Sequence, residues 1–340
     1  MDFDGIKRFK EEIDKVRNVV ILTHVRPDGD AIGSSLALCN YLIEKRYDCR
    51  VLLPSPCPAT LNWISGSEHL VDAENDITLC KGLIEKAEII ICLDFGVLMR
   101  LDALEDVVRD SKKSKVNVDH HIDFENFADI TIRDIRVSST AELIYSILHD
   151  WEAGMENTSV AVAECLYVGM LTDTGGFKYG TTTAEVHWAV GDLIDCGIDI
   201  LKIHNSLYNN FSEGRMRFVG FCVYEKMKVL RELKSAYIAV SLKEMQRFGI
   251  VAGDTESLVN YPLSIAGIVV SVLLIENEGF IKMSFRSIGN IAINEIAKEF
   301  GGGGHFNAAG GVSYKTLEET EAKLLELLPC LKPQTDKNVD

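Results

Sequence analysis

The sequence predicts an α/β protein in which a parallel-sheet domain is followed by a smaller domain of mixed α+β structure. In the first half of the 340-residue chain, short apolar runs alternate with stretches of helical periodicity. This alternation is typical of a parallel sheet flanked by helices. In the second half, apolar runs instead pair as hairpins around short turns such as ENEG. The length favours about two domains, and a hydrophobic content of 47% is ample for packed cores.

Four apolar runs are the candidate strands of the first domain. They are VVILT (19–23), CRVLLP (49–54), EIIICLDFG (88–96) and KVNVDHH (115–121). Helical spacing of apolar residues follows the first run, in SSLALCNYLIEKR, and predicts a helix there. Further helices are expected in SSTAELIYSILHDW, TSVAVAECLYVGMLTDT and TTTAEVHWAVGDLIDCG.

The pattern of apolar and polar residues changes after about residue 197. A polar segment with helical character predicts a linker over 198–222. Two hairpins are expected beyond it, KMKVLREL with AYIAVSL and IAGIVVSVLLI with FIKMSFRS, followed by the helix INEIAKEF. The predicted organisation is therefore a first domain over 1–197, the linker, a second domain over 223–332 and a loose tail over 333–340.

The charge and the cysteines exclude several classes of protein. A net charge of −16 argues against a protein that binds long duplex nucleic acid, because that binding needs many basic side chains. Nine cysteines without a CxxC pair indicate reduced thiols rather than a disulfide framework or a structural zinc site. We find no basic, apolar leader and no run long enough to span a bilayer, so we expect a cytoplasmic protein without membrane contact.

Acidic and imidazole side chains follow the predicted strands. His24, Asp28 and Asp30 follow the first run in HVRPDGDAIG, and Asp94 lies in LDFG. Ligands of open α/β sheets bind outside the carboxyl ends of the strands, so these groups are expected to meet at one edge. Alone, HVRPDGD has a simpler interpretation, since Pro-Asp-Gly favours a turn and Asp30 suits the cap of the next helix. Crowded carboxylates repel one another unless cations neutralise them, so the convergence favours a metal cluster.

The VDHH run adds Asp119, His120 and His121 to the same edge. Successive side chains of an extended chain point to opposite sides, so the two histidines are not expected to bind the same ion. We expect one to be a ligand while the other faces a substrate or the groups that surround the ligands. The alternative is one histidine in the core and one in solvent. Asp173 ends a helical run just before a Gly-Gly break. A carboxylate at a helix C-terminus opposes the helix dipole, so it needs a partner, for which a cation is one candidate.

These motifs resemble a known family. HVRPDGDAIGS, LDFG, VDHH and TDTGGF, in this order and spacing, are similar to the four motifs of the DHH phosphoesterase family. SFRS (284–287) and GGGGHFNAAGG (301–311) resemble the DHH-associated domain of its bacterial oligoribonuclease (nanoRNase) and pAp phosphatase branch. The resemblance covers nearly the whole chain. It implies a Rossmann-like DHH domain, a helical linker and a smaller substrate-binding domain.

The resemblance also implies two divalent cations. Carboxylates mixed with imidazoles suit Mn²⁺, with Mg²⁺, Co²⁺ or Fe²⁺ as alternatives that the sequence does not separate. Asp119 would orient an imidazole or another ligand, and His121 would face the phosphate that is cleaved. The implied ligands are His24, Asp28 and Asp94 for one ion, and Asp30, Asp94, His120 and Asp173 for the other, with Asp94 as the bridge.

Two features of the second domain are implied to hold the substrate. By themselves, four glycines are typical of a flexible loop, and Arg286 is typical of a protein surface. Glycines also let backbone N–H groups converge on an anion, and an arginine offers a two-pronged fork for phosphate. The resemblance assigns Arg286, Gly303, Gly304 and His305 to the substrate grip.

The implied activity is hydrolysis of short oligonucleotides (nanoRNA) to mononucleotides and of pAp to AMP, by a hydroxide that two metal ions activate. The protein would thus be an exoribonuclease and 3′-phosphatase of small nucleotides. Linear or cyclic dinucleotide hydrolysis remains an alternative, as does a nucleotide-sensing module that binds without cutting. Pyrophosphatase and exopolyphosphatase are more distant alternatives. Cleavage direction, RNA or DNA preference and the formation of a homodimer stay open.

Overall fold

The computed structural model of the chain describes residues 2–251 and 253–331, and the chain divides into two units, Met1–Asn210 and Phe211–Asp340. The division falls within the segment 198–222 that the sequence predicts as a linker. The predicted tail, 333–340, lies outside the described residues. No helix of the described chain is long and apolar enough to cross a membrane.

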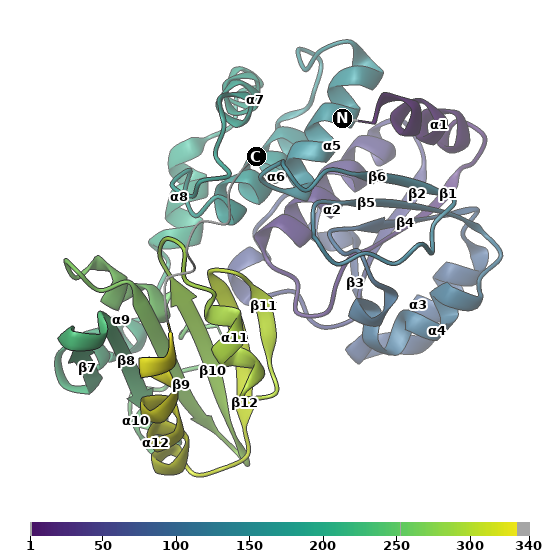
Figure 1. Cartoon of the computed structure of the whole chain (residues 1–340). Helices are drawn as coiled ribbons and strands as arrows, with labels where there is room; N and C mark the ends of the chain where they lie inside the picture. Colours follow the sequence, from purple (N-terminus) through teal and green to yellow (C-terminus); the bar gives the residue numbers. More distant parts are fainter. Residues whose placement is uncertain (1, 252, 332–340) are drawn as a thin grey trace, which may run out of the picture. The chain divides into compact units, whose positions relative to one another are not determined.

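The first unit is built on a six-stranded parallel sheet with the order β3-β2-β1-β4-β5-β6 (Figure 1). The four predicted strands are confirmed as β1, β2, β4 and β5. Two short strands, β3 and β6, extend the sheet at its edges. The bounds are β1 Asn18–Leu22, β2 Asp48–Leu53, β3 Leu70–Asp72, β4 Ile89–Leu93, β5 Ser114–Asp119 and β6 Ile130–Arg133.

Helices cover both faces of this sheet (Figure 1). In β1, Val19 and Ile21 face one hydrophobic core, while Val20 and Leu22 face the other. A strand buried on both faces explains why the predicted strands read as continuous apolar runs. The helices are α1 Phe3–Ile13, α2 Gly29–Glu44, α3 Ala73–Lys86, α4 Glu105–Asp110, α5 Thr140–Glu152, α6 Val160–Asp173, α7 Ala184–Asp195 and α8 Ile200–Tyr208.

Helices α2, α5 and α6 pack together on one face, and a glycine sets how closely they approach. A Cβ atom placed on Gly169 of α6 would lie 2.5 Å from Cβ of Ala141 and 2.9 Å from Oδ1 of Asp30. Real Cβ atoms do not approach other atoms this closely, so only glycine fits there. This close contact brings the first turns of α2 and α5 together beside the sheet.

The second unit contains a mixed six-stranded sheet with the order β11-β12-β10-β9-β8-β7. Both predicted hairpins are present, since β7 pairs with β8 and β9 pairs with β10 in antiparallel fashion, while β8 and β9 are parallel. Helices α11 and α12 pack on one face of this sheet. The bounds are α9 Glu213–Phe221, β7 Met227–Leu230, β8 Ser235–Val240, α10 Leu242–Arg247, β9 Val270–Asn277, β10 Phe280–Ser287, α11 Ile293–Lys298, β11 Gly303–His305, β12 Ala308–Ser313 and α12 Leu317–Leu327.

The cysteines agree with the sequence prediction. All nine are free thiols, and six of them are buried. The described residues therefore contain no disulfide.

Candidate metal centre

The carboxyl ends of the neighbouring strands β1, β4 and β5 meet at one edge of the first sheet. His24 follows β1, Asp94 follows β4, and His120 follows β5. Helix α2 begins at Gly29 just after β1, and Asp28 is its N-cap, accepting hydrogen bonds from the N–H groups of Asp30 and Ala31. Asp28 rather than Asp30 thus has the capping role that the turn interpretation gave to Asp30. The structure brings all six predicted ligands to this edge.

Three groups of side chains at this edge offer ligand atoms that lie within 4.8 Å of one another. Two of these groups share Asp94, whose backbone has the uncommon φ of 68°. That conformation turns the chain sharply after β4 and is rarely adopted by a residue other than glycine. The groups are His24 with Asp28 and Asp94; Asp30 with His120 and Asp173; and Asp94 with His120 and His121.

His24 is oriented as a ligand for the first group. Its Nδ1 lies 2.9 Å from the backbone oxygen of Val25, while Nε2 lies 3.4 Å from Oδ2 of Asp94. A histidine that donates Nδ1–H to a carbonyl oxygen presents the lone pair of Nε2, the arrangement that metal-binding histidines usually show. The side chain is nearly fully buried, so the orientation is fixed by packing.

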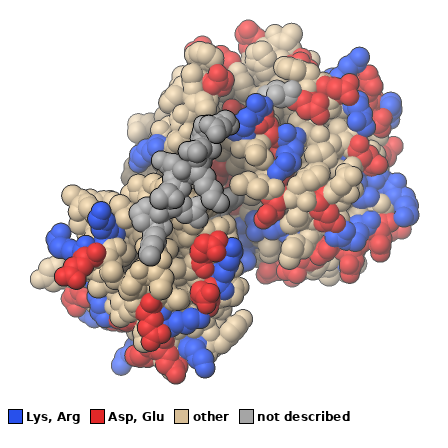
Figure 2. Space-filling model, in the orientation of Figure 1, with Lys and Arg blue, Asp and Glu red and all other residues tan. Residues whose placement is uncertain are grey.

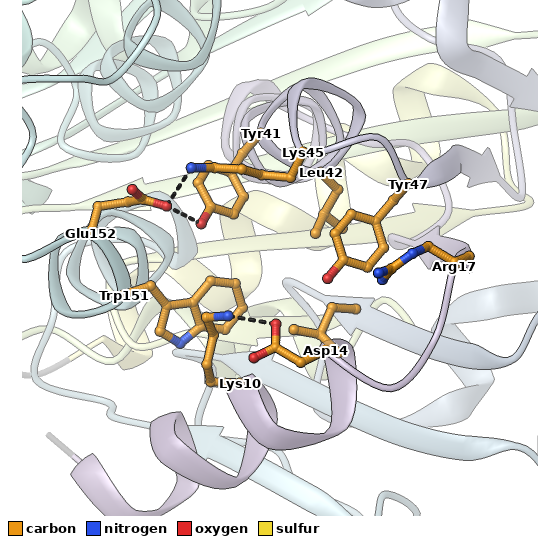
Figure 3. A pocket seen from close by; sticks show the side chains of 10 residues that line it. Lys10, Asp14, Arg17, Tyr41, Leu42, Lys45, Tyr47, Trp151 and Glu152 are labelled. Carbon is orange, nitrogen blue, oxygen red and sulfur yellow. Dashed lines mark hydrogen bonds and ion pairs between the residues drawn. The ribbon is translucent and has the colours of Figure 1, made fainter.

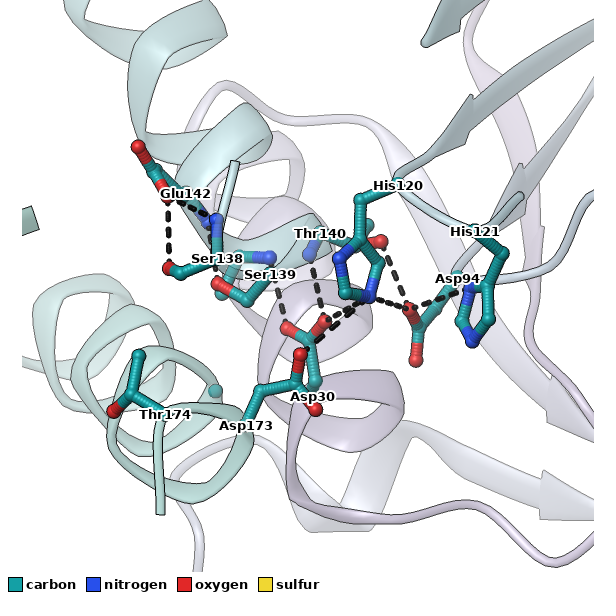
Figure 4. Close-up of polar contacts among 12 residues, drawn as sticks. Asp30, Asp94, His120, His121, Ser138, Ser139, Thr140, Glu142, Asp173 and Thr174 are labelled. Atoms are coloured by element: carbon teal, nitrogen blue, oxygen red, sulfur yellow. Dashed lines mark hydrogen bonds and ion pairs between the residues drawn. The ribbon is translucent and has the colours of Figure 1, made fainter. Parts of the chain in front are cut away.

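His120 lies in the middle of three carboxylates (Figure 4). Its Nε2 is 3.5 Å from Oδ2 of Asp173, 3.6 Å from Oδ1 of Asp94 and 3.9 Å from Oδ2 of Asp30. Each separation is longer than an N–H···O hydrogen bond. Atoms that each lie about 2 Å from a shared metal ion have separations of this order.

Asp30 is held by helix α5 (Figure 4). The backbone N–H of Thr140 donates to its Oδ2 at 2.6 Å, and the N–H of Ala141 donates to its Oδ1 at 2.8 Å. The first N–H groups of a helix have no partner within the helix, and they carry the positive end of its dipole. The next N–H, that of Glu142, is taken by the side chain of the N-cap Ser139. A buried carboxylate from α2 therefore completes the N-terminus of α5.

Thr140 adds a contact that the sequence analysis missed. Its hydroxyl donates to Oδ1 of Asp94 at 2.9 Å. The sequence signal was the run Ser138-Ser139-Thr140, which reads as an ordinary helix N-cap, and nothing in it identifies Asp30 and Asp94 as the acceptors.

Burial and neighbouring charges shift the pKa of three carboxylates in this small space. Burial, together with the charges of Asp94 and Asp173, raises the pKa of Asp30 well above its usual value. Burial and the charges of Asp94 and Asp28 raise the pKa of Asp173 to about 8. Burial also opposes ionisation of Asp94, but the contact with His24 and the charges of the imidazoles outweigh it and lower the pKa of Asp94.

His121 is positioned by Asp119. Nδ1 of His121 lies 2.8 Å from Oδ1 of the fully buried Asp119, and 3.7 Å from Oδ1 of Asp94. Burial lowers the pKa of His121, but the hydrogen bond to Asp119 and the charge of Asp94 outweigh it and raise the pKa to about 9. Arg133 fixes the backbone here by donating to the carbonyl oxygens of His121 and Ile122.

The expectation that His120 and His121 point to opposite sides is wrong. Their ring centroids are 4.8 Å apart, and both rings approach Oδ1 of Asp94. The reason is that β5 ends at Asp119, so the alternation of an extended strand does not reach the two histidines.

The donor set fits divalent cations. Within the described residues, no lysine or arginine forms an ion pair with the four carboxylates, although Asp30 and Asp94 are each only 1% exposed. Buried carboxylates without compensating charge are costly, and a metal ion supplies that charge. The other two carboxylates of the cluster are Asp28, which is exposed, and Asp173, which is half-buried.

The predicted substrate residues lie on the second unit. Arg286 is on β10, directly opposite Ala308 of β12, and Gly303 and Gly304 are on β11. A Cβ atom on Gly302 would lie 1.9 Å from the carbonyl oxygen of Gly310, so the start of the glycine run must be glycine for β11 to pair with β12. The backbone of His305 belongs to β11, but its side chain lies outside the described part of the chain.

A separate pocket lies at the opposite edge of the first sheet, near the amino ends of β1 and β2 (Figure 3). Its volume is about 240 Å³, and three aromatic rings, Tyr41, Tyr47 and Trp151, contribute to its walls. Its basic side chains already have partners. Lys45 pairs with Glu152 at 2.7 Å, Lys10 pairs with Asp14, and Arg17 lies over the ring of Tyr47. The cluster of carboxylates and imidazoles, rather than this pocket, is therefore the candidate functional site.

Known proteins resemble the chain along nearly its whole length. The bifunctional oligoribonuclease and PAP phosphatase NrnA of Bacillus subtilis is 27% identical over 309 residues, which cover 91% of this chain and 93% of that protein. A probable protein of the same name from Streptococcus mutans is 25% identical and covers 95% and 99%. The crystal structure of an exopolyphosphatase-related protein from Bacteroides fragilis is 38% identical, with a TM-score of 0.92 over 96% of this chain and 97% of that one.

Two family descriptions match the two units. The DHH family, N-terminal domain, matches residues 18–170, which include five of the six predicted metal ligands and end just before Asp173. The DHHA1 domain matches residues 234–329, which include the predicted substrate residues. The chain therefore belongs to the DHH family of phosphoesterases, and its second unit carries a DHHA1 domain.

Proposed function

We propose that this chain is a metal-dependent phosphoesterase that hydrolyses short oligoribonucleotides to mononucleotides and pAp to AMP. The observation that carries the proposal is the position of Asp94: it forms one group of ligand atoms with His24 and Asp28, and its Oδ1 lies 3.6 Å from Nε2 of His120, which forms another group with Asp30 and Asp173. A carboxylate placed in this way suits a pair of divalent ions, the arrangement of many phosphoesterases. The names of the relatives from Bacillus subtilis and Streptococcus mutans supply the substrate class.

The proposal assigns one ion to His24, Asp28 and Asp94, and the other to Asp30, Asp94, His120 and Asp173. When bound, divalent ions supply a water molecule of lowered pKa and positive charge for the phosphate. The mixture of carboxylate and imidazole ligands favours Mn²⁺. The hydrogen bonds from α5 support this assignment, because they hold Asp30 rigidly while leaving lone pairs on its oxygens for a cation.

His121 is proposed to contact the phosphate that is hydrolysed. Its Nδ1 is engaged by Asp119, so Nε2 is the ring nitrogen that would donate to a phosphate oxygen. Asp119 acts as a positioning residue for that ring. In the hydrolysis of pAp, the oxygen of water bonds to phosphorus, the bond from phosphorus to the 3′ oxygen breaks, and a proton ends on that oxygen. The products are AMP and inorganic phosphate.

The second unit is proposed to hold the remainder of the substrate through Arg286, Gly303, Gly304 and His305. The charge of the chain favours a short ligand for this binding site. Its net charge is −16, and acidic and basic side chains are interspersed over the face drawn in Figure 2. Long nucleic acid needs many basic contacts to phosphate, whereas a short substrate needs only a few.

The test is a panel of substrates with Mn²⁺: pAp, the dinucleotide pApA, a five-nucleotide RNA, cyclic di-AMP and pyrophosphate. We expect AMP from pAp, and mononucleotides from pApA and the short RNA. Asp94→Ala is expected to abolish turnover, because it removes the ligand that the proposal shares between the two ions. Lys81→Ala, which changes an exposed side chain of α3, is the control.

Several outcomes would contradict the proposal. Retention of most activity in Asp94→Ala would exclude the paired-ion assignment. Exclusive hydrolysis of cyclic di-AMP or of pyrophosphate would replace the substrate class. Tight binding of pAp without product after long incubation would make the protein a nucleotide sensor instead of an enzyme.

A further inference from the structure

Arg100 is a basic side chain beside the metal centre that the proposed function does not use. It lies on the 3-10 helix Leu98–Leu104, which follows Asp94 and the end of β4. Leu98, Leu101 and Leu104 of this helix are buried in the core between the sheet and α3 and α4. With three residues per turn, Leu98 and Leu101 occupy the same inward face; Leu104 follows a kink at Asp102. Arg100 therefore points away from that core, and its side chain is only partly buried.

The backbone of Arg100 is anchored next to the ligand His24. Its carbonyl oxygen accepts the N–H of Val25 at 2.8 Å, and its own N–H donates to the carbonyl oxygen of Val97 at 3.1 Å. Two backbone hydrogen bonds fix where the side chain begins. A side chain that starts from a rigid position loses less entropy when it binds a ligand.

The positive charge of Arg100 reaches two imidazoles of the centre. Burial and the charge of Arg100 act to lower the pKa of His24 and of His121. The neighbouring carboxylates outweigh them, so both pKa values are raised. Together with the backbone contact to Val25, this places Arg100 close enough for its charge to act on both imidazoles. His121 is the histidine that the proposed function turns toward the phosphate.

No carboxylate engages this guanidinium. Over residues 2–251 and 253–331, Arg100 forms no side-chain hydrogen bond and no ion pair within 4.0 Å of a carboxylate oxygen. Arg109 of the same unit, by contrast, pairs with Glu105 and Glu125. Arg100 therefore does not neutralise the acidic cluster beside it, and its five N–H donors are available to a ligand.

We propose that Arg100 binds the non-bridging oxygens of the phosphate that is hydrolysed. A guanidinium presents two parallel N–H groups, which match two phosphate oxygens. Negative charge builds up on these oxygens during phosphoryl transfer, and a fixed arginine stabilises it. This inference rests on the proposed function and adds a catalytic residue from the first unit to it.

The test compares Arg100→Gln and Arg100→Lys with two controls. Met99→Ala changes the 71% exposed neighbour on the same 3-10 helix. Arg46→Gln removes an equal charge just beyond the far end of α2, away from the centre. The substrates are pAp and 3′-AMP, which share the scissile 3′-phosphate but differ in the 5′-phosphate. Affinities for Mn²⁺ and for inorganic phosphate are measured by calorimetry.

We expect Arg100→Gln to lower kcat for both substrates by about a hundredfold, the usual effect of losing one donor to the reacting group. Arg100→Lys is expected to retain part of the rate, since it keeps the positive charge but lacks the two parallel N–H groups. Affinity of the Mn²⁺-loaded protein for phosphate should fall about tenfold, while affinity for Mn²⁺ stays within about twofold of the wild type. Both controls should match the wild type.

Three results would overturn the inference. The first is a kcat of Arg100→Gln within threefold of the wild type. The second is a loss with pAp but not with 3′-AMP, which would assign Arg100 to the 5′-phosphate. The third is an equal phosphate affinity of the Mn²⁺-loaded wild type and Arg100→Gln, which refutes the role of Arg100 whether or not the protein hydrolyses these esters. If the wild-type protein hydrolyses none of them, it is the proposed function that fails.

Discussion

Thr140 contacts two acidic side chains of the metal centre at once. Its backbone N–H donates to Oδ2 of Asp30 at 2.6 Å, and its hydroxyl donates to Oδ1 of Asp94 at 2.9 Å. Thr140 is fully buried, as are both carboxylates to within 1%. The first residue of α5 thus sets the separation between a carboxylate of α2 and a carboxylate that follows β4.

Removing the hydroxyl of this residue should weaken metal binding. Thr140→Val keeps the shape and the backbone N–H but leaves Oδ1 of Asp94 without its donor. We expect affinity for Mn²⁺, measured by calorimetry, to fall by about tenfold, which is typical of losing a hydrogen bond to a ligand. Ser146→Ala is the control, because this hydroxyl on the same helix bonds only to the helix backbone. Unchanged Mn²⁺ affinity in Thr140→Val would show that the contact does not orient Asp94.

The metal-free protein should become more stable when Asp173 loses its charge. The pKa of Asp173 is raised to about 8, whereas in the unfolded chain it is about 3.9. Below a pH of about 3.9, Asp173 is protonated in both the folded and the unfolded chain, so it does not reduce the free energy of unfolding. As the pH rises from about 4 to about 8, only the unfolded state ionises, so the free energy of unfolding falls; above that range the loss is constant.

Asp173→Asn removes this loss. Without metal, we expect its Tm to exceed that of the wild type by a few degrees at pH 8 and by less at pH 5, in scanning calorimetry with a chelator present. Saturating Mn²⁺ should reverse the order, because a ligand that binds only the native state stabilises the protein that holds it better. A Tm advantage that is equal at the two pH values would contradict the assigned pKa.

A methyl group at Gly169 should disturb both the fold and the centre. Gly169→Ala places its Cβ 2.5 Å from Cβ of Ala141 and 2.9 Å from Oδ1 of Asp30. Overpacking of this kind costs about 1–3 kcal/mol of stability. Gly191→Ala on α7 is the matched control, because no atom lies within 4 Å of its new Cβ, and it should gain a little from helix propensity. Denaturant unfolding measures both, and equal stability of the two variants would refute the close packing.

Loss of Arg286 should affect substrate binding more than chemistry. Arg286→Ala is expected to raise KM for pAp about tenfold or more, because a charge-assisted contact to phosphate is removed. Hydrolysis of a small generic phosphodiester, which has no second phosphate for Arg286 to bind, should change little. Lys298→Ala on α11 is the control, since this exposed side chain pairs only with Glu295 on the same helix. A fall in kcat with unchanged KM would contradict a binding role.

The sequence predicted the position of the centre because of a general property of parallel sheets. The apolar runs that contain β1, β4 and β5 end in His24, Asp94 and Asp119, and parallel strands place their carboxyl ends together. The assignment of six ligands to two ions came instead from the resemblance to the DHH family, since Asp173 ends the helix α6 and not a strand. The short strands β3 and β6 escaped prediction because their residues are mostly half-buried and form no apolar run.

The contacts from α5 could not be predicted for a different reason. The donors are backbone N–H groups of Thr140 and Ala141, and every residue other than proline carries one. Only the packing of α2 against α5 and α6 directs them to Asp30. The direction of His120 and His121 likewise depended on where β5 ends, and strand boundaries are the least certain part of a sequence-based assignment.

The proposed ligands come from distant parts of the chain: His24 lies near the start of the matched DHH region, 18–170, and Asp173 lies just beyond its end. During synthesis on the ribosome, all six strands of the parallel sheet emerge before α6, which carries Asp173. The nascent chain therefore has its sheet before it has a complete set of proposed ligands, and a product truncated between β6 and Asp173 is expected to lack one of them.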